Sequence, residues 1–111
     1  MGKGKLCLEL ESGGNMRLFR IYTERKHKAW LIRLVAEHFD GFTVFDTVGV
    51  WQHKQEKSVC IEIVTSDSAV GYKLNRISRA ICGLNKQECV LIVRYDVSAR
   101  LYKANCSEEL V

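Results

Sequence analysis

The sequence predicts one α+β domain in which a four-stranded antiparallel sheet carries two helices on one face. Segments with strand and helix patterns follow one another in the order strand, helix, strand, strand, helix, strand. A chain of 111 residues with 47% hydrophobic residues is also large enough for one core. Two crossovers around a central hairpin define the ferredoxin-like arrangement. We expect this domain over residues 16–104, between a leader (1–15) and a tail (105–111).

The leader differs in character from the rest of the chain. Residues 5–11 alternate between apolar and polar side chains, which suits a short extra strand, and residues 12–15 form a flexible Ser-Gly-Gly-Asn break. Gly-Gly-Asn before Met16 can also be encoded by a purine-rich ribosome-binding site. The leader is therefore either an extra strand or translated upstream sequence of a bacterial or phage gene.

The first strand and helix follow directly. Residues 17–23 predict a strand with Phe19, Ile21 and Thr23 on one face. Residues 28–39 predict a helix that Gly41 ends as a left-handed cap, because apolar residues recur over 28–39 at helical spacing.

A hairpin follows the first helix. Residues 42–48 and 59–65 predict two strands, rich in β-branched and aromatic residues. The polar stretch 49–58 between them lacks an Asn-Gly pair and predicts a long hairpin loop, which offers Trp51 and His53 to a ligand.

The second half completes the sheet. A helix is expected to begin near Ser66 or Asp67 and to end at Gly83. The continuous apolar centre of residues 88–95 predicts a strand buried on both sides or in the middle of the sheet. The sheet face without helices would expose Leu18, Phe45 and Val64, so a second subunit, residues 99–102 or a ligand should cover it. We expect a homo-oligomer.

Composition restricts the setting and the partners. The net charge of +4 favours anionic partners. Five cysteines without a Cys-x-x-Cys pair indicate a reducing cytosol, and the chain shows neither an apolar run of membrane-spanning length nor a signal-peptide core. The sequence therefore predicts a cytoplasmic protein.

No motif predicts catalysis, a metal or a cofactor. The three histidines lack metal-ligand spacing, no cysteine stands in a nucleophile signature, and glycine-rich phosphate loops are absent. Glu56 and Glu62 lie on or beside the hairpin, yet Glu62 suits a solvent-facing strand position. RNA-recognition modules carry paired aromatic residues on their third strand, whereas residues 59–64 have none and include Glu62. We therefore expect a non-enzymatic protein without specific nucleic-acid binding.

Cationic, aromatic and amide residues suggest a ligand site instead. Arg25 and Lys28 gather charge at the start of the first helix, where the macrodipole disfavours cations, so an anion would relieve the conflict; the competing interpretation is a hydrated loop. Trp51, Tyr22 and Tyr95 are the aromatic residues that can stack on a nucleotide base, although Trp51 suits an interface anchor equally well. The predicted ligand-binding residues are Arg25, Lys28, Trp51, His53, Asn85, Gln87, Arg94 and Arg100.

Short motifs over residues 17–95 resemble small proteins of phages and their bacterial hosts. They include Arg-Ile-Tyr-Thr-Glu at 20–24, Gly-Val-Trp at 49–51 and the run at 56–63. In size and character the chain is similar to the Thoeris anti-defence proteins. The resemblance implies an oligomeric sponge that sequesters cyclic ADP-ribose-type immune signals without cleaving them, in the host cytosol, and it carries over no site residue.

These observations together predict a protein that binds and sequesters a phosphorylated, nucleotide-like small molecule. Two alternatives stay open. One is a structural or protein-interaction domain that oligomerises through the open sheet face. The other is a small dimeric ferredoxin-like enzyme with His53 or His38 as acid or base.

Overall fold

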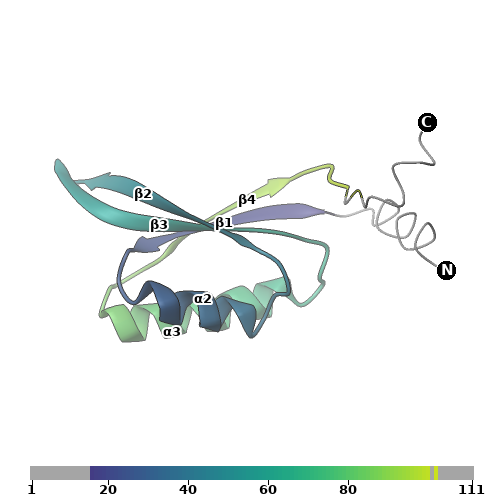
Figure 1. Cartoon of the computed structure of the whole chain (residues 1–111), viewed down its shortest axis with the longest axis horizontal. Coiled ribbons are helices and arrows are strands. Elements are labelled where there is room, and N and C mark those ends of the chain that lie inside the picture. The colour runs from purple at the N-terminus through teal and green to yellow at the C-terminus, as the bar shows by residue number, and fades with distance from the viewer. Residues whose placement is uncertain (1–15, 101, 103–111) are drawn as a thin grey trace.

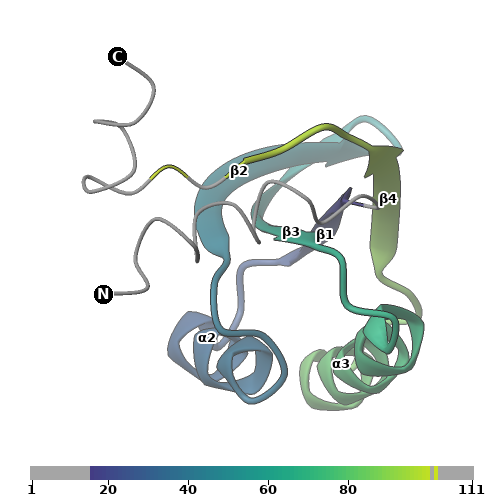
Figure 2. The same ribbon diagram turned by 90° about the vertical axis from the view of Figure 1, so that its right-hand side faces the viewer.

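The computed structural model of the chain describes residues 16–100 and residue 102. Six elements follow in the predicted order: β1 (Arg17–Glu24), α2 (Lys28–Ala36), β2 (Thr43–Trp51), β3 (Lys54–Thr65), α3 (Val70–Asn85) and β4 (Leu91–Asp96). The strands form one antiparallel sheet in the order β2-β3-β1-β4, with both helices side by side on one face (Figures 1 and 2). The ferredoxin-like prediction is confirmed. The predicted leader and tail lie outside the described residues.

The hydrophobic core lies between the sheet and the two helices. β1 alternates as the sequence predicts, with Phe19, Ile21 and Thr23 buried on the helix side. The bulkiest side chains that are almost completely excluded from water are Ile21, Leu31, Ile61, Ile63, Ile77 and Ile81. Burying each such side chain contributes about 1.5–3 kcal/mol. Because these residues come from β1, β3 and both helices, the core joins the two layers.

Both helices end at other residues than the sequence suggests. α2 stops at Ala36 instead of residue 39, and none of the described glycines has a positive φ, so Gly41 is not a left-handed cap. Gly83 lies inside α3, and the left-handed residue is Lys86, with φ 55°. The last turn of α3 ends at Asn85, which is buried and donates a hydrogen bond to Gln87 Oε1. Neither helix among the described residues is long and apolar enough to cross a membrane.

β4 is an edge strand, which contradicts the expected position in the middle of the sheet. It pairs with β1 alone, and its Leu91 and Tyr95 are 61% and 48% exposed. Ile92 packs against the core from the opposite face. The apolar run is continuous because one face contacts the core while the other remains uncovered, so a run of this kind does not distinguish an edge strand from a central one.

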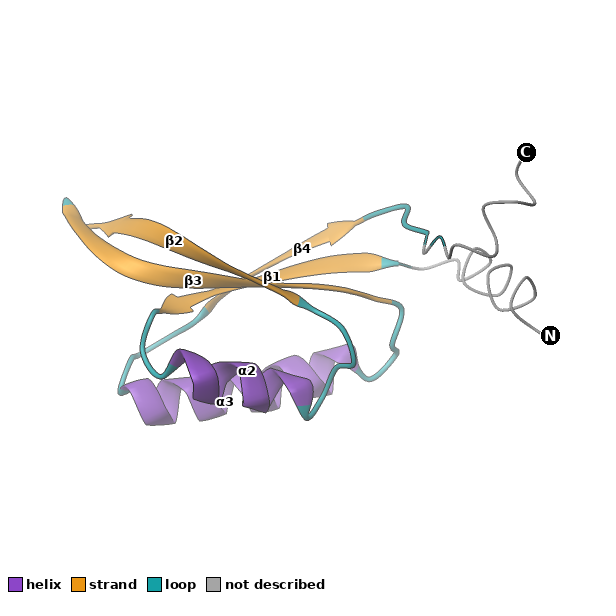
Figure 3. Ribbon diagram, in the orientation of Figure 1, coloured by secondary structure: helices purple, strands orange, loops and turns teal. Residues whose placement is uncertain are grey.

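The connection between β2 and β3 is a tight turn, and the predicted long loop is wrong. Strand pairing continues up to Trp51 opposite Lys54, which leaves only Gln52 and His53 in the turn (Figure 3). Both have positive φ, 52° and 65°. Two-residue turns of this hand match the twist of the strands and normally carry Asn-Gly. Here the twist of the paired strands imposes the turn on two unfavourable residues.

Replacing Gln52-His53 with Asn-Gly is expected to raise the free energy of unfolding by about 1–2 kcal/mol. A side chain other than glycine in the left-handed region costs roughly 1–2 kcal/mol, and the added backbone freedom of glycine in the unfolded chain removes part of the gain. Urea denaturation followed by circular dichroism measures the difference. The control is Ala-Ala, which deletes both side chains but keeps the strain; equal stability of the two variants would contradict the prediction.

Candidate functional site

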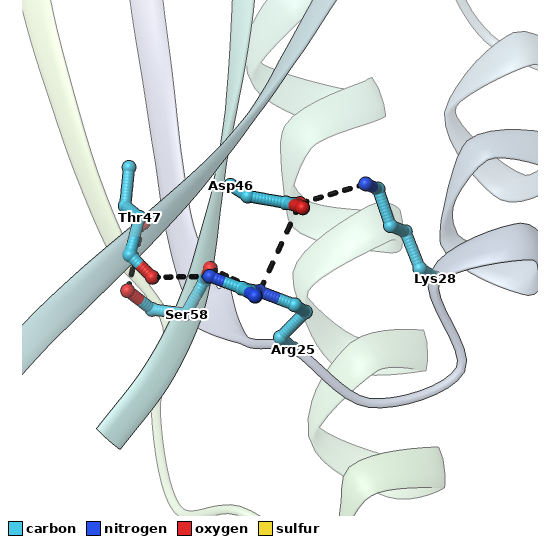
Figure 4. Close-up of polar contacts among 5 residues, drawn as sticks. All are labelled: Arg25, Lys28, Asp46, Thr47 and Ser58. Atoms are coloured by element: carbon cyan, nitrogen blue, oxygen red, sulfur yellow. Dashed lines mark hydrogen bonds and ion pairs between the residues drawn. The ribbon is translucent and has the colours of Figure 1, made fainter.

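Arg25 is held by the base of the β2–β3 hairpin. It follows β1 directly, and its Nε and Nη2 atoms donate hydrogen bonds to the backbone oxygens of Ser58 (3.0 Å) and Thr47 (2.6 Å). Its own backbone N–H donates to the Lys57 oxygen at 3.0 Å. Figure 4 shows the guanidinium reaching toward the oxygens of Thr47 and Ser58 on the two paired strands. Arg25 thus joins the start of the β1–α2 connection to the hairpin. Its two hydrogen-bond partners, Thr47 and Ser58, follow it in the sequence by 22 and 33 positions.

Lys28 and Arg25 share a carboxylate of the same chain. The Nζ atom of Lys28 lies 2.7 Å from Oδ1 of Asp46, and Nε of Arg25 lies 3.8 Å from the same oxygen (Figure 4). The hydrogen bond from Lys28, together with the charges of Arg25 and Lys28, keeps the pKa of Asp46 below its ordinary value. The two predicted anion-binding residues are therefore brought together, but Asp46 pairs with both and offsets one of their two charges.

Asn85 and Gln87 also meet, in a network inside the α3–β4 connection. Oε1 of Gln87 accepts hydrogen bonds from Thr23 Oγ1 (3.0 Å) and Asn85 Nδ2 (2.9 Å), and its Nε2 donates to the Cys89 oxygen at 2.8 Å. Thr23 and Asn85 are buried. The side-chain amides of Asn85 and Gln87 therefore connect the end of α3 to the end of β1.

The other predicted residues lie apart from these two groups. Trp51 and His53 are at the exposed tip of the hairpin. Arg94 is opposite Phe19 in the β1–β4 pairing, and its Nε lies 3.9 Å from Asp96; Arg100 is exposed beyond β4. Arg94 is therefore level with Ile63 of β3, because Ile63 is the partner of Phe19 on the other side. Trp51 is level with Lys54, nine positions earlier in β3, which corresponds to roughly 30 Å of strand. Trp51 and Arg94 therefore do not face one another within one chain.

A cavity of about 440 Å³ lies at the opposite end of the sheet from the hairpin tip. It is lined by the connections that follow α2 and β3 and, on one side, by Lys73 from the first turn of α3. Its lining residues are His38, Phe39, Asp40, Gly41, Val64, Thr65, Ser66, Asp67 and Lys73. Sequence reasoning did not find this place. The sequence does contain a signal for this site in two polar connections, His38-Phe39-Asp40-Gly41 and Thr65-Ser66-Asp67. Because β2 and β3 are antiparallel neighbours, both connections lie at the same end of the sheet.

Asp67 organises the wall of this cavity at the start of α3. Its Oδ1 accepts a hydrogen bond from the Ala69 N–H (2.8 Å), its Oδ2 pairs with Lys73 Nζ (2.5 Å), and its own N–H donates to Thr65 Oγ1 (3.0 Å). The hydrogen bond from Lys73, followed by the one from Ala69, keeps the pKa of Asp67 below its ordinary value. Lys73 is further held 5.3 Å from the ring centre of Phe39. The ammonium is therefore fixed before any ligand arrives.

His38 adds a second nitrogen group to the lining. Its Nδ1 lies 3.1 Å from the Leu34 backbone oxygen, which can only accept, so Nδ1 carries the hydrogen. In the neutral ring Nε2 is then an acceptor. The cavity combines this imidazole with one ammonium, two carboxylates and the hydroxyls of Thr65 and Ser66.

The sheet face without helices exposes two of the three apolar residues that the sequence predicts there, whereas Leu18 is half-buried. Phe45 and Val64 are 43% and 41% exposed. At its centre, Arg20 Nε lies 3.0 Å from Glu62 Oε2, and the ring centre of Tyr95 is 5.7 Å from the guanidinium carbon. Cys60 is buried beside them, and burial raises the pKa of its thiol. A buried thiol of this kind is a poor nucleophile, so this face offers apolar area rather than chemistry.

The sequence matches no family model and no curated protein. Solved structures share the fold. The PII-like protein CPII from Thiomonas intermedia K12, bound to ADP, AMP and bicarbonate, is 16% identical with a TM-score of 0.57, over 75% of this chain and 90% of CPII. The B. subtilis GlnK–ATP complex is 17% identical with a TM-score of 0.59, over 77% and 84%. A phage SAM lyase bound to S-methyl-5′-thioadenosine is 17% identical with a TM-score of 0.57, over 83% and 95%.

Proposed function

We propose that the protein binds a phosphorylated, nucleotide-like small molecule and releases it unaltered. The observation that carries the proposal is the cavity of about 440 Å³ between the ends of α2 and β3 and the start of α3. Ligand sites for small molecules have volumes of roughly 300–1,000 Å³ and a few fixed polar groups. Lys73 and Asp67 are such groups, because each is held in place by other contacts of the chain.

The mixed lining suits a ribose phosphate. Carboxylates such as Asp40 and Asp67 accept hydrogen bonds from ribose hydroxyls, as acidic residues do in dinucleotide sites. The Lys73 ammonium and the Ser66 hydroxyl donate to phosphate oxygens. Arg25 is less suited to this role, because its donors already bind the backbone oxygens of Thr47 and Ser58. The proposed phosphate contact therefore lies at Lys73, at the opposite end of the sheet from the Arg25–Lys28 pair.

The finer form of the proposal is a phage anti-defence protein that sequesters a cyclic nucleotide signal. Support comes from the resemblance of the sequence motifs to phage proteins and from a fold shared with structures that hold ATP, ADP, AMP or S-methyl-5′-thioadenosine. Sequestration needs tight, preorganised binding and no reaction. The enzyme alternative rests on His38 in the cavity lining, because an imidazole beside a bound ligand can transfer protons.

Mass spectrometry separates these functions. The purified protein is incubated with ATP, ADP or cyclic ADP-ribose, washed, denatured, and the released molecules are identified. Release of the unaltered nucleotide supports sequestration, whereas release of a converted product identifies an enzyme. If the protein retains none of these nucleotides and brings none from the expressing cell, the proposed function is wrong.

Replacing Lys73 with glutamine is expected to weaken binding of the retained nucleotide at least about tenfold, because a charged hydrogen bond to phosphate is lost. Isothermal titration calorimetry measures the dissociation constant. Lys86→Gln is the matched control, since it removes the same charge from an exposed residue at the other end of α3. Equal affinities of the two variants would remove the phosphate contact from this cavity.

A further inference from the structure

The β2–β3 hairpin extends past the rest of the sheet. The pairing of β1 with β3 ends at Glu24 opposite Ser58, so residues 48–57 form a two-stranded ribbon without a third strand. Figure 1 shows this segment projecting beyond the ends of both helices. We call residues 48–57 the hairpin arm. An isolated two-stranded ribbon is at best marginally stable in water, so the arm needs packing from elsewhere.

The arm carries large apolar side chains that nothing in the described chain covers. Val48, Val50 and Trp51 are 63%, 68% and 71% exposed. The turn at its tip adds two residues in the left-handed region. The exposed apolar area makes the free arm unfavourable, and the arm gains most from a partner that buries its tryptophan.

Trp51 lies on the same side of the sheet as the face without helices. Side chains alternate along β2, so Phe45, Thr47, Gly49 and Trp51 share one side. Phe45 pairs with Cys60, which is on the side of Tyr22 and therefore away from the helices. The arm thus extends the open face, which we define by the half-buried Leu18 and the exposed apolar residues Phe45, Val64, Leu91 and Tyr95.

We propose that a second copy of this chain covers the open face and that Trp51 anchors it. The charges at the centre of the face, Arg20 and Glu62, pair within the chain at 3.0 Å. Two such faces can therefore meet without repulsion, although each chain has a net charge of +4. At the centre of the face, an unrelated acidic or basic partner would find no unbalanced charge to recognise.

The available area fits a contact between copies. An aromatic side chain carries about 150–250 Å², and Phe45, Trp51 and Tyr95 are 43%, 71% and 48% exposed. With Val64 and Leu91, which are 41% and 61% exposed, each chain offers several hundred Å² on this side of the sheet, against about 800 Å² per partner in a standard interface. The same patch on both copies gives the self-complementary contact of a symmetric oligomer.

Sedimentation velocity over a series of protein concentrations tests the proposal. The wild type is expected to sediment as a multiple of one chain, and Trp51→Ser and Tyr95→Ser should each raise the concentration of half-association at least about tenfold. Tyr72→Ser is the control, because Tyr72 is 67% exposed on α3, on the layer away from the open face. All three residues are exposed, so circular dichroism should show folded variants.

Each other outcome overturns the proposal. A wild type that stays a single chain leaves the face to a ligand or to another part of the chain. An unchanged Tyr95→Ser variant would show that the arm docks elsewhere, and an equal effect of Tyr72→Ser would place the interface on the helices. As a second readout, Trp51 fluorescence in a Trp30→Phe background should shift to shorter wavelength as the concentration rises; emission that does not shift would exclude burial of Trp51.

Discussion

Replacing Arg25 with alanine is expected to lower the free energy of unfolding by about 2–4 kcal/mol, because two charged hydrogen bonds to backbone oxygens are lost. The oxygens of Thr47 and Ser58 lose their guanidinium donors at the base of the hairpin. Urea denaturation monitored by circular dichroism measures the change.

The matched control is Lys28→Ala, which removes the other cation of the same cluster. Its contact with Asp46 is an exposed ion pair, and such pairs contribute little to stability. A similar loss in both variants would show that Arg25 acts through charge alone. If the proposed function is right, folded Arg25→Ala protein should bind nucleotide with the affinity of the wild type. The proposed ligand cavity does not include Arg25 and lies at the other end of the sheet.

Replacing Gln87 with alanine is expected to lower the free energy of unfolding by about 2–4 kcal/mol, because two buried polar groups lose their partner. Thr23 Oγ1 and Asn85 Nδ2 both donate to Gln87 Oε1, and both residues are 4% exposed. Thermal and urea denaturation give the difference.

Two further variants test the cause. Glu88→Ala changes the adjacent exposed residue and should leave stability nearly unchanged. Thr23→Val removes one of the two donors to Gln87 Oε1, so the loss of stability in a Thr23→Val, Gln87→Ala double variant should be smaller than the sum of the two single losses. Additive losses would contradict the assigned network.

The layers of the fold follow from local patterns. The alternation of Phe19 and Ile21 and the helical spacing of Leu74 and Ile77 identify the faces that become buried. The turn at Gln52-His53 does not follow, because neither residue favours a positive φ and only the pairing of long strands imposes it. Lys86 takes the left-handed position expected of Gly83 in the same way, beside the buried Asn85, and its residue type does not favour a positive φ either.

The candidate site was predictable only in part. Sequence reasoning identified Arg25 and Lys28 as a cationic pair, and they do lie together, but Asp46 joins them from a strand 18 positions beyond Lys28. Such long-range partners are not visible in a local pattern. The cavity was missed for the same reason, because His38, Thr65 and Lys73 come from three separate segments of the chain.

The hairpin arm separates two properties that most small domains must encode in the same residues. The buried cluster lies between the sheet and the helices and contains no residue of the arm. Substitutions at the tip can therefore alter recognition while the packing that drives folding remains intact. An engineer could therefore graft a new recognition sequence onto the ten residues of the arm without altering the buried cluster.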